Sequence, residues 1–317
     1  MKEYYYCIDI GGTTIKGGIV SEDNQILFQD KVSTKPIPDT NYLADSILDL
    51  IEILEEKSGY PISESEGLGI GSPGMIDSPS GVICFAGNLK LKDYNLVEAL
   101  KEYITVPIKI ANDADIATLA EKMIGAGKNY KNFVMLTIGT GIGSGIVLND
   151  KLYSWHVPYS GEIGHMKISD SGIKCSCGET NCYEALASTK ALVRMTKEAM
   201  EKNPDSKMWK KYNLSSANGK TVFEFKDTDA VAKQVFDEYI KNLGNGIVNL
   251  VNILFPEAII IGGAISNQKD ELIAPLKKYV DEHIYAKHIN YKANIITAEL
   301  TGDAGIIGGK FLFDKEI

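Results

Sequence analysis

Arginine and long hydrophobic runs are the two features that this 317-residue chain most clearly lacks. Arg194 is the only arginine, so lysines make up nearly all of the 33 positive side chains, against 42 Asp and Glu residues and a net charge of −9. Arginine dominates contacts to phosphates and bases, so this composition argues against a nucleic-acid-binding protein. The apolar segments at 247–255 and 259–261 are far shorter than the roughly 20 residues of a transmembrane helix. We therefore expect no membrane span and, since no cleavage-site pattern follows the N-terminus, a cytoplasmic protein.

Cysteine is scarce and unevenly placed. Of the five cysteines, Cys7 and Cys84 stand alone, whereas the other three fall between positions 175 and 182. In a cytosolic chain, an odd number of closely spaced cysteines is more typical of metal ligation than of a disulfide framework.

A histidine precedes this cysteine cluster and completes a set of four metal ligands. Three thiolates and an imidazole suit a tetrahedral structural Zn²⁺, although unrelated buried thiols are the alternative. Glu162 and Glu184 flank the set, and folding the loop on zinc would bring them together; each alone is more typical of a solvated surface charge. The predicted ligands are His165, Cys175, Cys177 and Cys182.

The hydrophobic pattern predicts two α/β halves that begin alike. Length favours two domains at about 100 to 200 residues each, and each half opens with a strand that ends in a glycine turn, which predicts two lobes with a cleft between them. The segment 202–227 is polar and weakly periodic, and we interpret it as an insertion or a mobile cap. Strands are expected at 4–10, 15–20, 25–32, 67–70, 108–111, 133–138, 144–148, 151–153 and 258–261, and helices at 42–57 and 304–313.

Glycine-rich turns at three strand ends are candidate nucleotide-binding segments. Adjacent glycines let backbone N–H groups approach phosphate oxygens closely, and Asp9 could position Mg²⁺ through water. An ordinary hairpin turn is the alternative for the first, and plain turn punctuation for the third, where adenine could stack on the flat backbone. The candidates are Asp9, Gly11, Gly12, Thr13, Thr14 and Lys16 in the first, Thr140, Gly141 and Gly143 in the second, and Gly262 and Gly263 in the third.

Asp113 follows an expected strand and opens a helix. A carboxylate at the carboxyl end of a parallel strand lies where ligands collect, and it could accept a proton from a substrate hydroxyl that Asn112 orients. The alternative is that Asn112 or Asp113 only caps the helix. A G-x-G-x-x-G pattern occurs at 69–74, but Pro73 stands where a dinucleotide-binding helix should start, so we do not expect that function there.

Taken together and in this order, the segments resemble the ROK family of bacterial sugar kinases and repressors, within the actin-like ATPase superfamily. The resemblance implies a two-lobed α/β fold of the ribonuclease H-like type, with a mixed sheet and flanking helices in each lobe. It implies that Asp113 is the catalytic base, that the glycine turns bind ATP, and that zinc orders the sugar site. Asn181 replaces the glycine that the family commonly has before the last cysteine, and it should preserve that turn. The positions that match sugar contacts are Asn88, Asn112, Asp113, Glu162, His165 and Glu184.

The resemblance also gives expectations about domains and activity. The N-terminal lobe is expected at 1–112, joined by the C-terminal helix 304–317, and the C-terminal lobe at 113–303. Only eight residues precede Asp9, which favours an enzyme over a repressor with an N-terminal DNA-binding segment. The expected activity is transfer of phosphate from ATP, with Mg²⁺, to glucose; N-acetylmannosamine, N-acetylglucosamine, fructose and allose are alternative substrates, and a non-catalytic sugar sensor is the alternative function. The resemblance also implies a homodimer.

Overall fold

The computed structural model describes residues 3–34, 42–153 and 161–314. Its backbone contacts divide the chain into two compact units. The first consists of residues 1–129, 145–161 and 299–317, and the second of residues 130–144 and 162–298. The C-terminal segment therefore belongs to the same unit as the N-terminus.

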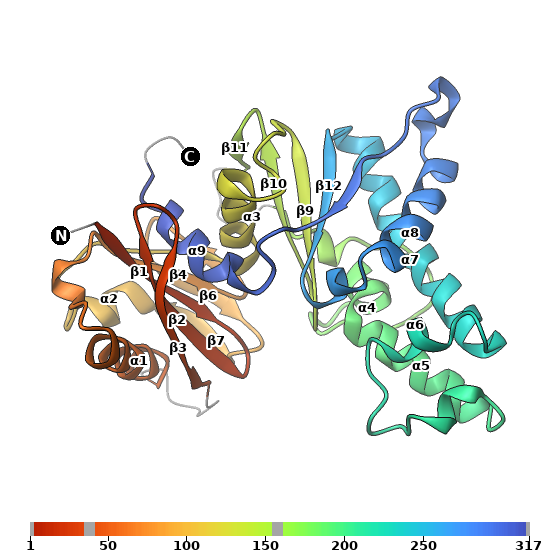
Figure 1. Ribbon diagram of the computed structural model, residues 1–317, viewed down its shortest axis with the longest axis horizontal. Coiled ribbons are helices and arrows are strands. Elements are labelled where there is room, and N and C mark those ends of the chain that lie inside the picture. The colour runs from red at the N-terminus through yellow and green to blue at the C-terminus, as the bar shows by residue number, and fades with distance from the viewer. Residues whose placement is uncertain (1–2, 35–41, 154–160, 315–317) are drawn as a thin grey trace. The chain divides into compact units, whose positions relative to one another are not determined.

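The first unit is built on a five-stranded mixed sheet (Figure 1). Its first three strands form an antiparallel meander, and the other two run parallel to the first. In this register Asp9 lies beside Gly71, and Gly71 lies beside Ala111, so the three residues form one row near the carboxyl ends of the parallel strands. In sheet order the strands are β3 (Ile26–Ser33), β2 (Thr14–Ser21), β1 (Tyr4–Ile10), β4 (Leu68–Ser72) and β8 (Ile108–Asn112).

Helices cover both faces of this sheet. Successive side chains of a strand point to opposite faces, so neighbouring residues of one strand contact different helices. Gly17 of β2 lies against leucines of α1 (Tyr42–Ser58), whereas the next residue, Gly18, lies against Ile306 of α9 (Ala304–Phe311). The same unit contains α2 (Leu96–Lys101), α3 (Asp113–Ile124) and a small antiparallel sheet that the sequence pattern does not predict. That sheet consists of β5 (Met75–Asp77), β6 (Val82–Ala86) and β7 (Leu91–Asn95).

A second five-stranded sheet carries the later glycine turns, and its strand β12 runs parallel to both of its neighbours, β9 and β13. The long helix α7 packs against α4, α5, α6 and α8. The strands, in sheet order, are β11 (Lys151–Leu152), β10 (Ile142–Leu148), β9 (Phe133–Ile138), β12 (Ala258–Gly262) and β13 (Ile295–Thr297). The helices are α4 (Tyr183–Ala187), α5 (Thr189–Lys202), α6 (Thr221–Phe225), α7 (Ala230–Leu254) and α8 (Asp270–His283).

The predicted α/β fold class is confirmed; two details differ from the expectations, and a third agrees with them. The compact units place residues 113–129 in the first unit rather than in a second lobe, because α3 packs on α9, β4 and β8. The segment 202–227, interpreted as an insertion or a mobile cap, is packed on its neighbours, because Met208 and Ala217 are buried in a small apolar cluster with Met200. The G-x-G-x-x-G pattern leads from β4 into β5 and not into a helix, as Pro73 indicates.

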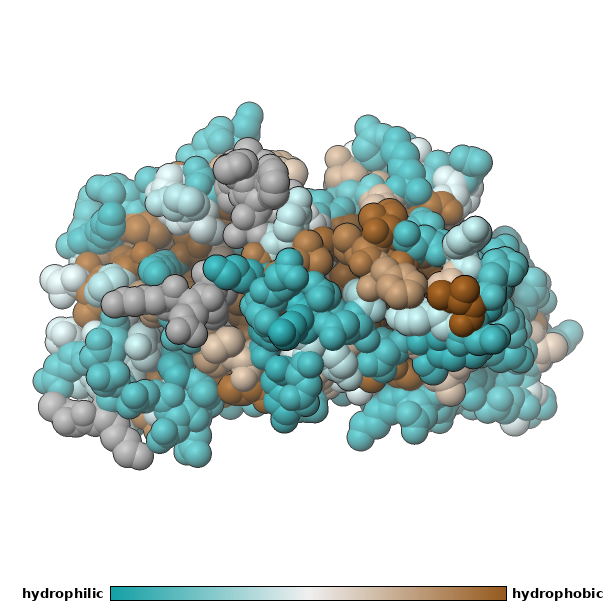
Figure 2. All heavy atoms as spheres, turned by 90° about the horizontal axis from the view of Figure 1, so that it is seen from above, coloured by the Kyte–Doolittle hydropathy of each residue, from teal (hydrophilic) through white to brown (hydrophobic). Residues whose placement is uncertain are grey.

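The surface is mixed in character. Figure 2 shows one face, on which hydrophilic side chains cover most of the area and hydrophobic patches lie between them. Among the described helices, none combines the length and the apolar character that crossing a membrane requires.

Candidate active site and metal centre

The first glycine turn joins β1 to β2 and is held tightly by its own backbone. The Gly11 N–H donates to the Thr14 carbonyl at 2.9 Å, and the Thr34 hydroxyl donates to the Gly11 carbonyl at 2.8 Å. Asp9 precedes the turn and lies opposite Lys16 in the antiparallel register. Burial raises the pKa of Asp9, and Lys16 opposes that rise. The turn between β1 and β2 is thus a hairpin turn, which was the alternative to a nucleotide-binding segment. It is also flanked by the half-buried carboxylate of Asp9, which lies opposite Lys16.

Asp113 opens α3 at the carboxyl end of β8. Asn112 forms the cap of this helix: its side-chain oxygen accepts from Ala114 N at 2.8 Å and from Asp115 N at 3.4 Å. These two bonds confirm the capping role that was the alternative for Asn112. The amide nitrogen of Asn112 donates separately to the Gly74 carbonyl at 3.0 Å. The Asp113 side chain accepts from Ala114 N at 2.8 Å. Asp113 therefore lies at the strand edge that the sequence indicated, two residues beyond the row that begins with Asp9.

Asn88 lies in the turn between β6 and β7, next to the first glycine turn. A side chain built on Gly12 would come within 3.9 Å of Asn88 Cβ. The first unit thus brings together the predicted residues of the first turn, Asn88, Asn112 and Asp113.

The second glycine turn, between β9 and β10, is held from the side of α4 and α5. The Gly139 carbonyl accepts from Thr189 N at 2.9 Å, and Ile142 N donates to Glu184 Oε2 at 3.1 Å. A Cβ on Gly141 would lie 2.3 Å from that same carboxylate oxygen, so a larger residue there would have to displace the Glu184 carboxylate.

The third glycine pair lies against the same turn. Gly263 has a φ of 78°, and a Cβ there would lie 2.5 Å from the Ile138 carbonyl. Gly262 lies beside Thr137 in the parallel register of β12 and β9. The second unit therefore brings the predicted second and third glycine segments together.

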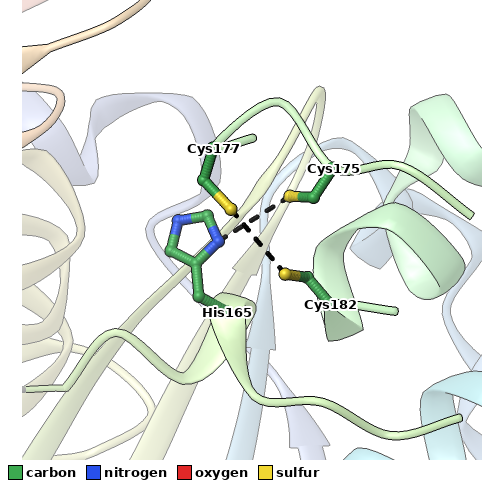
Figure 3. A group of neighbouring side chains, drawn as sticks. All are labelled: His165, Cys175, Cys177 and Cys182. Carbon is green, nitrogen blue, oxygen red and sulfur yellow. Dashed lines mark hydrogen bonds between the residues drawn. The ribbon is translucent and has the colours of Figure 1, made fainter. Parts of the chain in front are cut away.

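The four predicted metal ligands converge (Figure 3). Their ligand atoms all lie within 4.8 Å of one another. His165 Nδ1 lies 3.8 Å from Cys175 Sγ, and the sulfurs of Cys177 and Cys182 are 3.7 Å apart. Two sulfurs bound to one tetrahedral zinc at about 2.3 Å are separated by about 3.8 Å. Donor set and spacing both fit a closed, structural zinc site.

The second ring nitrogen of His165 faces a carboxylate. His165 Nε2 lies 4.0 Å from Glu162 Oε2, which is close enough for charge attraction but longer than a hydrogen bond. Partial burial raises the pKa of Glu162, and His165 opposes that rise. Asn181 adopts a φ of 65°, which confirms that it keeps the left-handed turn before the last cysteine.

Two groups that contact Glu184 escaped the sequence analysis. Ser176, between two ligand cysteines, donates from its hydroxyl to Glu184 Oε1 at 2.8 Å. The backbone N–H of Ile142 binds the other carboxylate oxygen. Ser176 could have been suspected from its place between ligands, but a backbone contact over 42 positions leaves no sequence signal.

Known proteins are similar to this chain over most of its length. The ROK family model matches residues 5–316. A glucokinase from Halalkalibacterium halodurans is 34% identical over 318 residues, which cover 99% of this chain and 96% of that protein. A xylose repressor from Bacillus subtilis is 31% identical and covers 90% of this chain, but only 70% of the repressor is matched.

A solved structure is similar over the same extent. The crystal structure of a ROK family glucokinase from Streptomyces griseus, in complex with glucose and AMPPNP, superposes with a TM-score of 0.85 at 29% identity and covers 98% of both chains. With the family model matching nearly every residue, this chain belongs to the ROK family.

Proposed function

We propose that this chain is an ATP-dependent sugar kinase that converts glucose to glucose 6-phosphate. The observation that carries the proposal is the position of Asp113, directly after β8 and close to the row that contains Asp9. The glucokinase relatives at 34% and 29% identity support the choice of glucose.

In this proposal Asp113 is the general base. Its carboxylate takes the proton from the sugar hydroxyl as that oxygen attacks the γ-phosphorus of ATP. The N–H groups of the turns at 11–14 and 139–143 and the Lys16 ammonium balance charge on the phosphates. Arg194 is engaged with Glu198 and the Ala185 carbonyl, which supports a mechanism without an arginine finger from this chain.

Two metals have separate roles in the proposal. Asp9 is the carboxylate that holds, through water, the Mg²⁺ that arrives with ATP. The His165 and cysteine cluster holds a structural zinc, which supplies folding free energy to its loop. The residues proposed to contact the sugar are Asn88, Asn112, Glu162, His165 and Glu184. A homodimer stays a prediction from the family resemblance, and a cytoplasmic location stays a prediction from the N-terminal sequence.

Asp113→Asn tests the catalytic assignment. We expect kcat to fall by at least about 100-fold, the usual effect of losing a general base, while calorimetry finds nearly unchanged glucose affinity. Asp115→Asn is the matched control, because it makes the same charge change in the same helical turn. Turnover retained by Asp113→Asn at the level of Asp115→Asn would disprove the assignment.

A coupled assay of ADP release tests the substrate and the alternative function. ATP and each of glucose, fructose, allose, N-acetylmannosamine and N-acetylglucosamine are supplied in turn, and glucose should give the highest kcat/KM. The repressor relatives make a sugar-binding protein without turnover the second candidate. Sugar binding by calorimetry with no ADP release from any sugar would favour that candidate.

A further inference from the structure

Glu184 connects two segments of the second unit that the proposed function treats separately. One carboxylate oxygen, Oε2, accepts from Ile142 N at the end of the second glycine turn. The other, Oε1, accepts from the Ser176 hydroxyl at 2.8 Å. Because Ser176 stands between Cys175 and Cys177, a single side chain bridges the metal loop and the glycine turn.

The helix that carries Glu184 is short and fixed at both ends. It begins directly after the proposed ligand Cys182, ends at Ala187 with Ser188 as its C-cap, and has only five residues. Tyr183, its first residue, is fully buried and donates its hydroxyl to the Leu243 carbonyl at 2.7 Å. Just beyond the helix, Thr189 N donates to the Gly139 carbonyl at the other end of the glycine turn. The turn is thus held at two points by one segment that starts at a metal ligand.

We propose that Glu184 is a positioning residue through which the metal loop, by way of Ser176, fixes the conformation of the nucleotide-binding turn at 139–143. The inference rests on the proposed function for the identity of the nucleotide. Its physical basis is that a glycine turn has many accessible conformations, and a fixed acceptor on Ile142 N removes some of them before the nucleotide binds. A Cβ on Gly141 would lie 2.3 Å from Glu184 Oε2, so the carboxylate packs closely on the turn as well as accepting from Ile142 N.

Ser176→Ala tests the link without replacing a proposed metal ligand, and it keeps the Glu184 carboxylate that is a proposed sugar contact. We expect AMPPNP affinity by calorimetry to weaken, and KM for ATP to rise, by about two- to tenfold, the effect of one lost hydrogen bond. Zinc content and KM for glucose should stay at wild-type values, and Ser176→Thr, which keeps the hydroxyl, should restore nucleotide affinity. Ser169→Ala is the control, because Ser169 lies in the same segment and bonds to Ser171 instead.

Three outcomes would overturn the inference. They are nucleotide affinity of Ser176→Ala equal to that of Ser169→Ala, loss of zinc from Ser176→Ala, and a rise in KM for glucose without one for ATP. Failure of the proposed function is distinguishable, because it would show as no phosphorylation of any sugar by the wild-type protein, whereas the AMPPNP measurement needs no turnover.

Discussion

Asp9 illustrates how neighbours set the behaviour of one side chain. It is the next-to-last residue of β1, and a side chain on Gly305 at the start of α9 would come within 2.8 Å of its carboxyl group. The packing of α9 thus removes water from a carboxylate, and burial raises the pKa of Asp9 above the ordinary 3.8. An ionised carboxylate in such a place favours the unfolded state until a cation joins it.

Asp9→Asn should therefore stabilise the protein without ligands and impair its activity. Because the folded pKa is raised, ionised Asp9 destabilises the fold above its unfolded pKa. The gain should therefore be fully present at pH 7, shrink as pH falls through the raised folded pKa, and be absent below the unfolded pKa of about 4. We expect a gain on the order of 1 kcal/mol at pH 7, measured as the urea midpoint against pH, together with weaker Mg²⁺-ATP binding. The exposed Asp205 supplies the control Asp205→Asn, and equal pH profiles for the two variants would contradict the assigned cause.

At the scale of elements, the metal loop and α4 depend on each other. A five-residue helix is far too short to be stable alone. Its first turn follows Cys182, and the loop before it is polar and contains few buried side chains beyond Cys175 and Cys182. With the proposed zinc bound, metal ligation would be the main source of order for residues 165–182 and a condition for the start of α4.

Cys177→Ser tests this dependence. Purified wild-type protein should contain about one zinc per chain, whereas the variant should lose the metal, raise KM for glucose and show faster proteolysis between 165 and 182. Cys84→Ser, which changes a cysteine outside the cluster, should keep metal and KM. Unchanged metal content and KM in Cys177→Ser would refute a structural zinc at these residues.

At the scale of the whole molecule, a buried carboxylate joins the end of the chain to its first half. Glu121 of α3 is fully buried, and it accepts from Ala126 N at 2.7 Å, Leu300 N at 2.8 Å and Glu299 N at 3.2 Å. Residue 299 is where the chain re-enters the first unit. Glu121 thus fixes the segment that leads into α9, which packs on β1, β2, β4 and α3.

Glu121→Ala should destabilise the protein by about 3 kcal/mol, because it leaves three backbone N–H groups without their acceptor in the interior. Urea unfolding followed by circular dichroism measures the loss. Glu198→Ala removes a half-exposed carboxylate that pairs with Arg194 at 3.2 Å, and should cost no more than about 0.5 kcal/mol. Equal midpoints for the two variants would rule out this role of Glu121.

Much of the fold could be predicted because its signals are local. The strands β1, β9 and β12 and the helix α1 follow the expected ranges within about two residues, as runs of apolar residues with the right period and clear breaks do. The small sheet β5–β7 was missed because its strands have three to five residues and mixed polarity. The metal ligands were readable because cysteine spacing is distinctive, whereas the hydrogen bonds of Glu184 and Glu121 join positions up to 179 apart.

The sequence by itself determined the α/β class, the three glycine turns, the cysteine and histidine ligands, and a surface with a single arginine. Those features depend on residue types and on short distances along the sequence, which are the same whether or not the chain is folded. Only the tertiary structure decided that α3 joins the first unit, that Asn112 caps its helix, and that Glu184 bridges the proposed metal loop and the glycine turn. Each of these depends on which distant backbone groups a side chain meets after folding, and a polar side chain takes whichever partner packing brings within reach.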